Sequence, residues 1–326
     1  MSVKLCTFKN ISDICKKHII MAMEEIRTFA RIYDHLGSMD CRKRIAVVCP
    51  DDACTRSAIA EALKKGLADF LLVSTSDALA TLPEDISCHG GERVMTREAA
   101  SPDDAAAKAV EAVRAGEADI LMKGLINTDN FLRAILNKEH GLLPKGNVLT
   151  HLSVAQLPGY HKLIFFGDVA VIPYPTLQQR VEMLRYNVAT CRKFGIACPK
   201  VALIHFTEKV NEKFPNSVDY VALEKMAAEG EFGPVEMGGP MDVKTACDRH
   251  SAEVKGIASP VCGDADLLMF PNIESGNTFY KTITLFGGAD IAGMLQGAIC
   301  PVILTSRSDT TLSKLSSMAL ACLSAL

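Results

Sequence analysis

The chain approaches its C-terminal end with the segment CPVILTSRSD (Cys300–Asp309), which changes character halfway along. Its first half favours a strand, its second half carries hydroxyl, guanidinium and carboxylate groups, and a helical pattern follows over 311–325. The N-terminus of a helix favours negative charge, and arginine matches the geometry of phosphate or carboxylate. The junction predicts an anion site, and the alternative is that Asp309 or a serine simply caps the helix.

Outward from this segment, short apolar runs alternate with helical patterns along the chain. Strands are expected at 44–49, 70–73, 119–122, 200–205, 234–237, 266–270, 291–295 and 302–304. Helices are expected at 11–35, 52–65, 101–116, 176–194, 217–229, 242–254, 277–287 and 311–325. Strands that are apolar on both faces and alternate with helices are typical of a parallel sheet covered by helices.

The middle of the chain breaks this alternation. Two long apolar segments, 148–157 and 162–172, are separated by a Pro-Gly turn signal at Pro158. They predict a hairpin or an extended edge element that begins a second domain. We therefore expect two α/β domains that share a cleft, with the first formed by residues 1–150 plus 299–326 and the second by 151–298.

Length and composition exclude several classes of protein. The 326 residues are 48% hydrophobic and 22% charged, which is enough for a sizeable core. The net charge of −3 gives no general attraction to nucleic acid or to an acidic membrane. No apolar run reaches the roughly 18 residues that span a bilayer. We expect a cytoplasmic protein that binds neither nucleic acid nor membrane.

The 12 cysteines include no Cys-x-x-Cys pair. Several of them, such as Cys49, Cys191 and Cys300, lie inside apolar runs, where a free cysteine behaves as a small hydrophobic residue. This distribution favours reduced thiols in the cytosol over disulfides or a metal site.

Three predicted strand-to-helix junctions carry groups suited to a phosphorylated ligand. The first is MKGLINTD (Met122–Asp129), with Arg133 on the helix that follows. The second is PNIESGN (Pro271–Asn277), whose last two residues are expected to open a helix, and the third is Thr305–Asp309. In open α/β sheets, ligands bind beyond the carboxyl ends of strands, and all three junctions lie at such ends.

Familiar cofactor motifs are missing. The first strand is followed by Cys49-Pro50-Asp51-Asp52 and not by Gly-x-Gly-x-x-Gly, and the chain has neither a Gly-x-x-x-x-Gly-Lys-Ser/Thr loop nor a His-Glu-x-x-His motif. The histidines are scattered, and we interpret each of them as structural or solvated: His18, His35, His89, His140, His151, His161, His205 and His250.

The first junction, KGLINTDNFLR (Lys123–Arg133), resembles the Lys-Gly-x-x-Asn-Thr-x-x-Phe-Leu-Arg signature of phosphate butyryltransferases. Further matches follow in the family's order at Pro199–Leu203, Gly238–Pro240, Pro271–Asn277 with Tyr280 and Lys281, and Pro301–Arg307 with Asp309, Lys314 and Leu315. Over residues 44–326 the chain is thus similar to the phosphate acetyl/butyryltransferase family.

The resemblance implies an enzyme that interconverts butyryl-CoA, or a related short-chain acyl-CoA, and phosphate with acyl phosphate and CoA. A thiolate attacks directly in a ternary complex. The resemblance also implies no metal and no redox cofactor, with coenzyme A as a substrate, and a homo-oligomer. The implied fold is similar to that of isocitrate and isopropylmalate dehydrogenases, with two three-layer α/β domains, the active site in their cleft, and a C-terminal segment that rejoins the first domain.

By resemblance, Ser306 and Arg307 match a Ser-Arg pair at the reacting centre. Arg307 is expected to bind the phosphoryl oxygens bidentately and Ser306 to donate to the developing oxyanion. Acetyltransferases carry an aspartate seven residues after the motif serine, where this chain has Ser313. Asp309 is therefore the candidate base for the CoA thiol, and its alternative role is the N-cap of the last helix.

The other site residues are also inferred from the resemblance. Arg133 matches an arginine associated with CoA phosphates, and its alternative role is an ordinary salt bridge. At about Leu285 an arginine of the acetyltransferases is replaced by an apolar side chain, which suits a longer acyl chain. Gly276 is expected to serve backbone conformation. The remaining expected binding residues are Lys123, Asn127, Thr128, Asn277 and Lys281.

Three alternatives stay open at this point. The first is a phosphate acetyltransferase, which uses acetyl-CoA. The second is an NAD-dependent hydroxyacid dehydrogenase of the same fold, which needs clustered metal-binding aspartates and a nicotinamide site, and the sequence indicates neither. The third is a non-catalytic acyl-CoA-binding protein, and only Arg307 and Asp309 argue against it.

Overall fold

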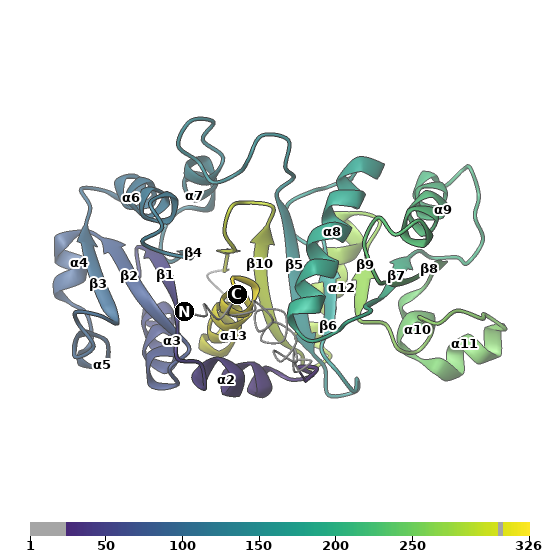
Figure 1. Cartoon of the computed structure of the whole chain (residues 1–326), viewed down its shortest axis with the longest axis horizontal. Coiled ribbons are helices and arrows are strands. Elements are labelled where there is room, and N and C mark those ends of the chain that lie inside the picture. The colour runs from purple at the N-terminus through teal and green to yellow at the C-terminus, as the bar shows by residue number, and fades with distance from the viewer. Residues whose placement is uncertain (1–23, 306–308) are drawn as a thin grey trace, which may run out of the picture.

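The computed structural model describes residues 24–305 and 309–326 (Figure 1). Its strands are β1 (Lys43–Val48), β2 (Ala68–Ser74), β3 (Val94–Glu98), β4 (Ile120–Lys123), β5 (Thr150–Gln156), β6 (Ile164–Gly167), β7 (Lys200–Ile204), β8 (Glu236–Met241), β9 (Leu267–Met269), β10 (Asp290–Gln296) and β11 (Val302–Ile303). Its helices are α2 (Phe29–Gly37), α3 (Ala53–Lys64), α4 (Ser76–Ala80), α5 (Glu84–Ser87), α6 (Pro102–Arg114), α7 (Thr128–Ile135), α8 (Leu177–Lys193), α9 (Pro215–Ala228), α10 (Val243–Cys247), α11 (Arg249–Lys255), α12 (Ile273–Leu285) and α13 (Thr311–Ser324).

The strands of the described residues form one 11-stranded sheet that extends across the molecule in the order β3-β2-β1-β4-β11-β10-β5-β6-β9-β7-β8 (Figure 1). Both outer parts of this sheet are parallel, as the sequence predicts. The centre is antiparallel, because β10 runs against both β11 and β5, and β5 runs against β6. The sequence predicts the antiparallel pair of β5 and β6 as a hairpin, but it does not predict that β10 runs against its neighbours.

The hairpin predicted in the middle of the chain is confirmed as β5 and β6. It lies in the centre of the sheet, so the alternative of an edge element is wrong. The reversals at β10, β5 and β6 make β9 run opposite to β4 and β11. The chain therefore leaves β9 in the direction opposite to that in which it leaves β4 and β11.

Helices cover both faces of the sheet. Alternate strand residues point to opposite sides, so Ile45 and Val47 of β1 join one cluster of buried side chains and Ala46 and Val48 join another. Helices α2, α3, α8, α9 and α13 contribute to the first cluster. Helices α6 and α7 cover the opposite face in one half of the sheet, and α10, α11 and α12 cover it in the other half.

Several predicted helices differ from the structure at their ends. Residues 11–23 of the first predicted helix lie outside the described residues, and α2 follows within its second half. Helix α12 begins at Ile273, four residues earlier than predicted, because Asn272 caps it by accepting from the Ser275 backbone N–H. The helix expected at 242–254 is two helices that are separated at Asp248, which caps the second of them.

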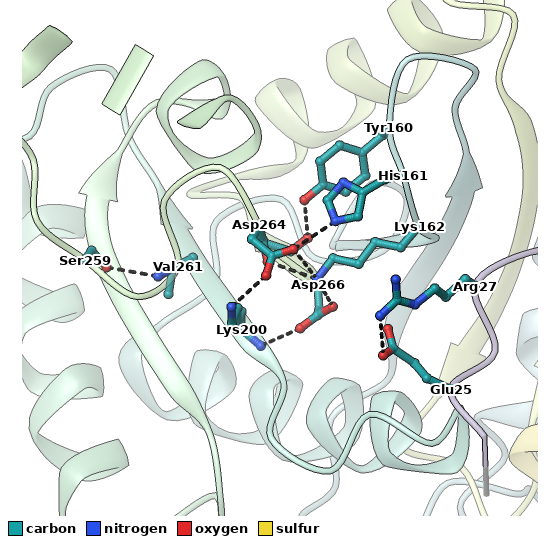
Figure 2. A network of polar contacts seen from close by, with 11 residues as sticks. Glu25, Arg27, Tyr160, His161, Lys162, Lys200, Ser259, Val261, Asp264 and Asp266 are labelled. Carbon is teal, nitrogen blue, oxygen red and sulfur yellow. Dashed lines mark hydrogen bonds and ion pairs between the residues drawn. The ribbon is translucent and has the colours of Figure 1, made fainter. Parts of the chain in front are cut away.

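A network of charged residues joins the beginnings of three parallel strands (Figure 2). Lys162, just before β6, lies 2.9 Å from a carboxylate oxygen of Asp264 and 2.6 Å from one of Asp266. Lys200 at the start of β7 lies 2.6 Å from the other oxygen of Asp264. Burial alone raises the pKa of Asp264, but hydrogen bonds from Lys200 and Lys162 hold the pKa below its usual range. The network fixes these strand ends to one another.

Within the described residues, the helices lack the combination of length and apolar character needed to cross a membrane. The ten cysteines of this part of the chain are free thiols.

Candidate active site

A cavity of about 130 Å³ lies where β5, β10, α12 and the segment from β11 into α13 meet. Its walls combine residues from widely separated parts of the chain: His151, Val169, Ala170, Asn277, Tyr280, Lys281, Ile291, Gly293, Leu304, Thr305, Asp309, Ser313 and Ser317. Asn277 of the second sequence junction, Lys281 four residues further along, and Asp309 of the third junction are thus brought together at one place.

Thr305 and Asp309 of the third junction belong to the described residues. Ser306 and Arg307 lie outside the described residues. Thr305 is buried and its hydroxyl donates to the carbonyl oxygen of Lys123 at 3.5 Å, which ties the end of β11 to the end of β4. Asp309 is half-buried at the cavity wall.

Helix α13 is capped by Thr310, whose hydroxyl accepts from the Ser313 backbone N–H at 3.1 Å. The alternative in which Asp309 serves as this cap is therefore wrong. Ser313, the position at which acetyltransferases are expected to carry an aspartate, also lies at the cavity. Asp309 lies four residues before Ser313 in the sequence, and both line the same cavity.

Helix α13 is held in place by its buried polar side chains. The ammonium group of Lys314 donates to Thr55 at 2.8 Å and to Asp52 at 3.3 Å, both at the start of α3. Ser317 accepts from the backbone N–H of Gly293 on β10 at 3.0 Å. These contacts fix the cavity wall that Ser313 and Ser317 form.

Helix α12 brings a polar face to the cavity. Asn277 and Lys281 are four residues apart, so they lie on one side of the helix. The Asn277 amide donates to the carbonyl oxygen of Val169 at 3.0 Å. Gly276 is buried, and a Cβ atom there would lie 2.3 Å from the carbonyl oxygen of Asp168. Gly276 therefore allows the close approach of two backbones.

Asp168 organises the loop below this helix. One of its carboxylate oxygens accepts from the Thr150 hydroxyl at 2.8 Å and from the His151 backbone N–H at 2.9 Å. The other accepts from the backbone N–H groups of Ala170 at 2.7 Å and Val171 at 2.9 Å. One buried carboxylate thus fixes the start of β5 and the loop after β6.

His151 is a cavity residue that sequence reasoning missed, because a single histidine in an apolar strand carries no signal of its own. Its ring is buried, and Nδ1 lies 3.4 Å from the Ser153 hydroxyl oxygen. Burial lowers the pKa of His151, and the negative charges of Asp168 and Asp309 oppose that effect.

Tyr280 lies beside the expected binding residue Lys281, whose ammonium group is 4.6 Å from the centre of the Tyr280 ring. Burial raises the pKa of Tyr280 to about 12, and the charge of Asp309 acts in the same direction. The phenol therefore keeps its proton at neutral pH and presents a hydrogen-bond donor.

The first junction lies partly apart from the cavity. Lys123 is buried at the end of β4 and donates to the carbonyl oxygen of Gly124 at 3.3 Å. Asn127 caps α7 by accepting from the Asp129 backbone N–H at 2.8 Å. Thr128 and Arg133 are exposed on the same helix. The structure does not bring these α7 residues into the cavity wall.

The position expected to favour a longer acyl chain also lies elsewhere. Leu285 is 74% exposed at the end of α12 and does not line the cavity. The structure therefore places this side chain at the surface, and its expected role in acyl-chain length stays a prediction. The apolar part of the wall is formed by Val169, Ile291 and Leu304.

Comparison with known proteins identifies the family. Residues 75–322 match the family model described as phosphate acetyl/butaryl transferase. The phosphate butyryltransferase of Clostridium acetobutylicum is 36% identical over 91% of this chain and 98% of its own length. The phosphate acetyltransferase of Rhizobium meliloti is 32% identical over 85% of this chain and 87% of its own length.

Among solved structures, the branched-chain phosphotransacylase of Enterococcus faecalis V583 is similar, with a TM-score of 0.76 and 30% identity over 87% of this chain and 99% of that one. The chain therefore belongs to the phosphate acetyl/butyryltransferase family. It is a transferase of mixed α/β fold, as the sequence predicts.

Proposed function

We propose that this enzyme interconverts butyryl-CoA, or a related short-chain acyl-CoA, and phosphate with acyl phosphate and CoA. The observation that carries the proposal is the meeting of Asn277, Lys281 and Asp309 at one cavity. These residues come from two separate sequence motifs, and their shared cavity indicates that both motifs contribute to one site. Family membership supplies the class of reaction.

The proposed chemistry needs an anion site, an oxyanion donor and a proton acceptor. Arg307 binds the phosphoryl oxygens and Ser306 donates to the oxyanion. Asp309 acts in the proton step, which its place at the cavity supports. Lys281 adds positive charge at the same wall.

Other expected residues bind the remainder of the substrate in this proposal. Arg133, Asn127 and Thr128 on α7 contact the phosphates of CoA, which the exposure of all three side chains supports. Lys123 supports the phosphoryl site from the end of β4, next to Thr305.

The small cavity and its apolar wall support an acyl chain of a few carbons. Each buried methylene contributes about 0.8 kcal/mol, so two more methylenes in butyryl-CoA than in acetyl-CoA favour the former by about 1.6 kcal/mol, or roughly 15-fold in kcat/KM. A preference for acetyl-CoA in matched assays favours the alternative, a phosphate acetyltransferase.

A thiol-release assay tests the proposed function. Purified enzyme is mixed with butyryl-CoA, with and without phosphate and with and without NAD, and free CoA is measured. We expect release that depends on phosphate and ignores NAD. A requirement for NAD supports a dehydrogenase, while binding without release supports an acyl-CoA-binding protein. No release from butyryl-, propionyl- or acetyl-CoA contradicts the proposal.

We further propose that the reaction needs no metal and no redox cofactor, with coenzyme A as substrate. Turnover that is unchanged after dialysis against a chelator is the expected result. A cytoplasmic location is supported by the free thiols of the described residues. A homo-oligomer is supported by the exposed apolar side chains of Leu285 and Phe286, and light scattering measures its mass.

The domain organisation also belongs to this proposal. We propose a first domain of residues 1–150 plus 299–326 and a second of 151–298, arranged as in isocitrate and isopropylmalate dehydrogenases. Two contacts support the discontinuous first domain. Strand β11 pairs with β4, and α13 packs against α2 and α3. Limited proteolysis that cuts near 150 and 299 is the expected outcome.

A further inference from the structure

We propose that His151 accepts the proton of the CoA thiol, and that Asp309 stabilises the imidazolium that forms. The inference rests on the proposed function and assigns its proton step to a residue outside the family motifs quoted above. Both side chains line the same cavity, His151 from the strand β5 and Asp309 from the segment before α13.

The position of the imidazole ring is fixed on several sides. The backbone N–H of His151 donates to the buried carboxylate of Asp168, and Nδ1 faces the Ser153 hydroxyl at 3.4 Å. Gly293 on the neighbouring strand β10 leaves space for the other edge of the ring. A Cβ atom at Gly293 would lie 2.9 Å from Cε1 and 3.0 Å from Nε2 of His151. Because Nδ1 faces the Ser153 hydroxyl, Nε2 is the nitrogen we assign to the thiol.

The charged surroundings suit a proton acceptor. The charged and titratable groups around the ring are Asp168 from the loop after β6, Asp309 before α13, and Tyr280 and Lys281 from α12. Burial lowers the pKa of His151, so the ring is neutral at neutral pH and ready to accept a proton. The charges of Asp168 and Asp309 then favour the imidazolium after transfer.

An imidazole also matches a thiol better than a carboxylate does. Ordinary pKa values are about 8.5 for a thiol, about 6.5 for an imidazole and about 4 for a carboxylate. Proton transfer is most effective when the acceptor has a pKa near the working pH. These ordinary values favour an imidazole over a carboxylate as the direct acceptor of a thiol proton.

The step conserves atoms and electrons. The S–H bond of CoA breaks and an N–H bond forms at Nε2 of His151. The thiolate attacks the carbonyl carbon of the acyl phosphate, a C–S bond forms, and the C–O bond to phosphate breaks with its electron pair leaving on phosphate. In the reverse direction the imidazolium returns the proton to the departing thiolate.

The test compares His151→Gln with His205→Gln, a matched change at another buried histidine, which lies at the end of β7. We expect His151→Gln to lower kcat by about 10²-fold or more, with KM for butyryl-CoA changed only a few-fold. In the wild type, kcat/KM is expected to decline toward low pH as His151 binds a proton. We expect this decline to be absent from His151→Gln. His205→Gln keeps the wild-type profile.

A second variant separates chemistry from packing. His151→Ala is assayed with added imidazole, and partial recovery of kcat is the expected result. The proposal is overturned if His151→Gln keeps the wild-type kcat and pH profile. It is also overturned if added imidazole does not restore kcat in His151→Ala and the decline of kcat/KM at low pH remains in His151→Gln. If both variants fail to fold, the pH profile of kcat/KM in Asp309→Asn tests the proposal. A decline of kcat/KM that moves to lower pH supports His151 as the proton acceptor. Loss of this decline assigns the proton to Asp309. A wild-type enzyme without phosphate-dependent CoA release refutes the proposed function itself.

Discussion

Thr310 caps the last helix, and this single assignment changes the interpretation of its neighbour Asp309. A carboxylate that caps a helix is occupied with backbone N–H groups. Asp309 precedes this cap and lies at the wall of the cavity that also contains His151 and Ser313. The sequence leaves cap and base as equal alternatives, because serine, threonine and aspartate are all good caps and stand close together here.

Asp309→Asn shows whether the carboxylate takes the thiol proton itself. The negative charge of Asp309 raises the pKa of His151, so its removal lowers that pKa. Activity that requires neutral His151 falls as pH drops through this pKa, so we predict an acid decline of kcat/KM that moves to lower pH, together with a lower kcat. The measurement is the pH profile of kcat/KM for wild type, Asp309→Asn and Asp309→Ser. An acid decline at the wild-type position in both variants contradicts the assigned role.

Arg307→Ala tests the expected phosphoryl contact. Loss of one donor to the developing charge typically lowers kcat by about 10²- to 10³-fold, and we predict at least this loss in the CoA-release assay. Arg307→Lys keeps the charge without the bidentate fork and should recover only part of it. Arg97→Ala on the edge strand β3 is the control. Near-normal turnover of Arg307→Ala removes this residue from the site.

Helix α12 brings residues that follow β9 to the cavity that the segment after β11 also lines. Because the sheet reverses direction in its centre, the chain leaves β9 in the direction opposite to that in which it leaves β4 and β11. Helix α12 follows β9 and brings Asn277 and Lys281 to the cavity. The sequence predicts the motif but not this path, since its start at Ile273 depends on the Asn272 cap.

Gly276→Ala tests how closely α12 packs on the loop after β6. The new Cβ atom would lie 2.3 Å from the carbonyl oxygen of Asp168, so helix or loop has to move. Overpacking of this kind costs about 1–3 kcal/mol, and we predict a lower urea midpoint and reduced kcat. Gly159→Ala is the control, because no atom lies within 4 Å of its added Cβ. Equal stability of the two variants contradicts the tight contact.

At the scale of the whole molecule, the sequence predicts the strands and helices well where their patterns are regular. The strands 44–49, 119–122 and 200–205 and the helix 176–194 appear within one or two residues of the structure. Strand β3 is missed because its Met-Thr-Arg-Glu stretch is largely exposed at the edge of the sheet. The antiparallel centre is missed because strand direction depends on pairings between residues far apart in the chain, such as Leu295 with His151.

Lys162→Met tests the charged network that joins three strands (Figure 2). The change leaves the carboxylate of Asp266, whose side chain is 3% exposed, without its cation. Breaking a buried pair in this way costs about 3–5 kcal/mol, and urea unfolding measures the loss. Lys225→Met is the control, because its pair with Glu229 is exposed, and it should cost less than about 1 kcal/mol.

The same variant has a defined dependence on pH. Lys162 lowers the pKa of Asp264 and opposes the burial that raises the pKa of Asp266. Its stabilising effect therefore exists where these carboxylates are charged, and it is lost as pH falls and they bind protons. We predict that the free-energy difference between wild type and Lys162→Met is largest near neutral pH and shrinks toward low pH. A difference that grows on acidification contradicts the assigned pairing.

Formation of butyryl-CoA from butyryl phosphate and CoA tests acyl transfer at this cavity most directly. Wild-type enzyme is incubated with both substrates in the absence of NAD, and butyryl-CoA and phosphate are measured together over time. We predict that the two products appear in equal amounts, and that Arg307→Ala slows both by the same factor. Folded wild-type enzyme that forms no butyryl-CoA, or that releases phosphate without it, contradicts the assignment.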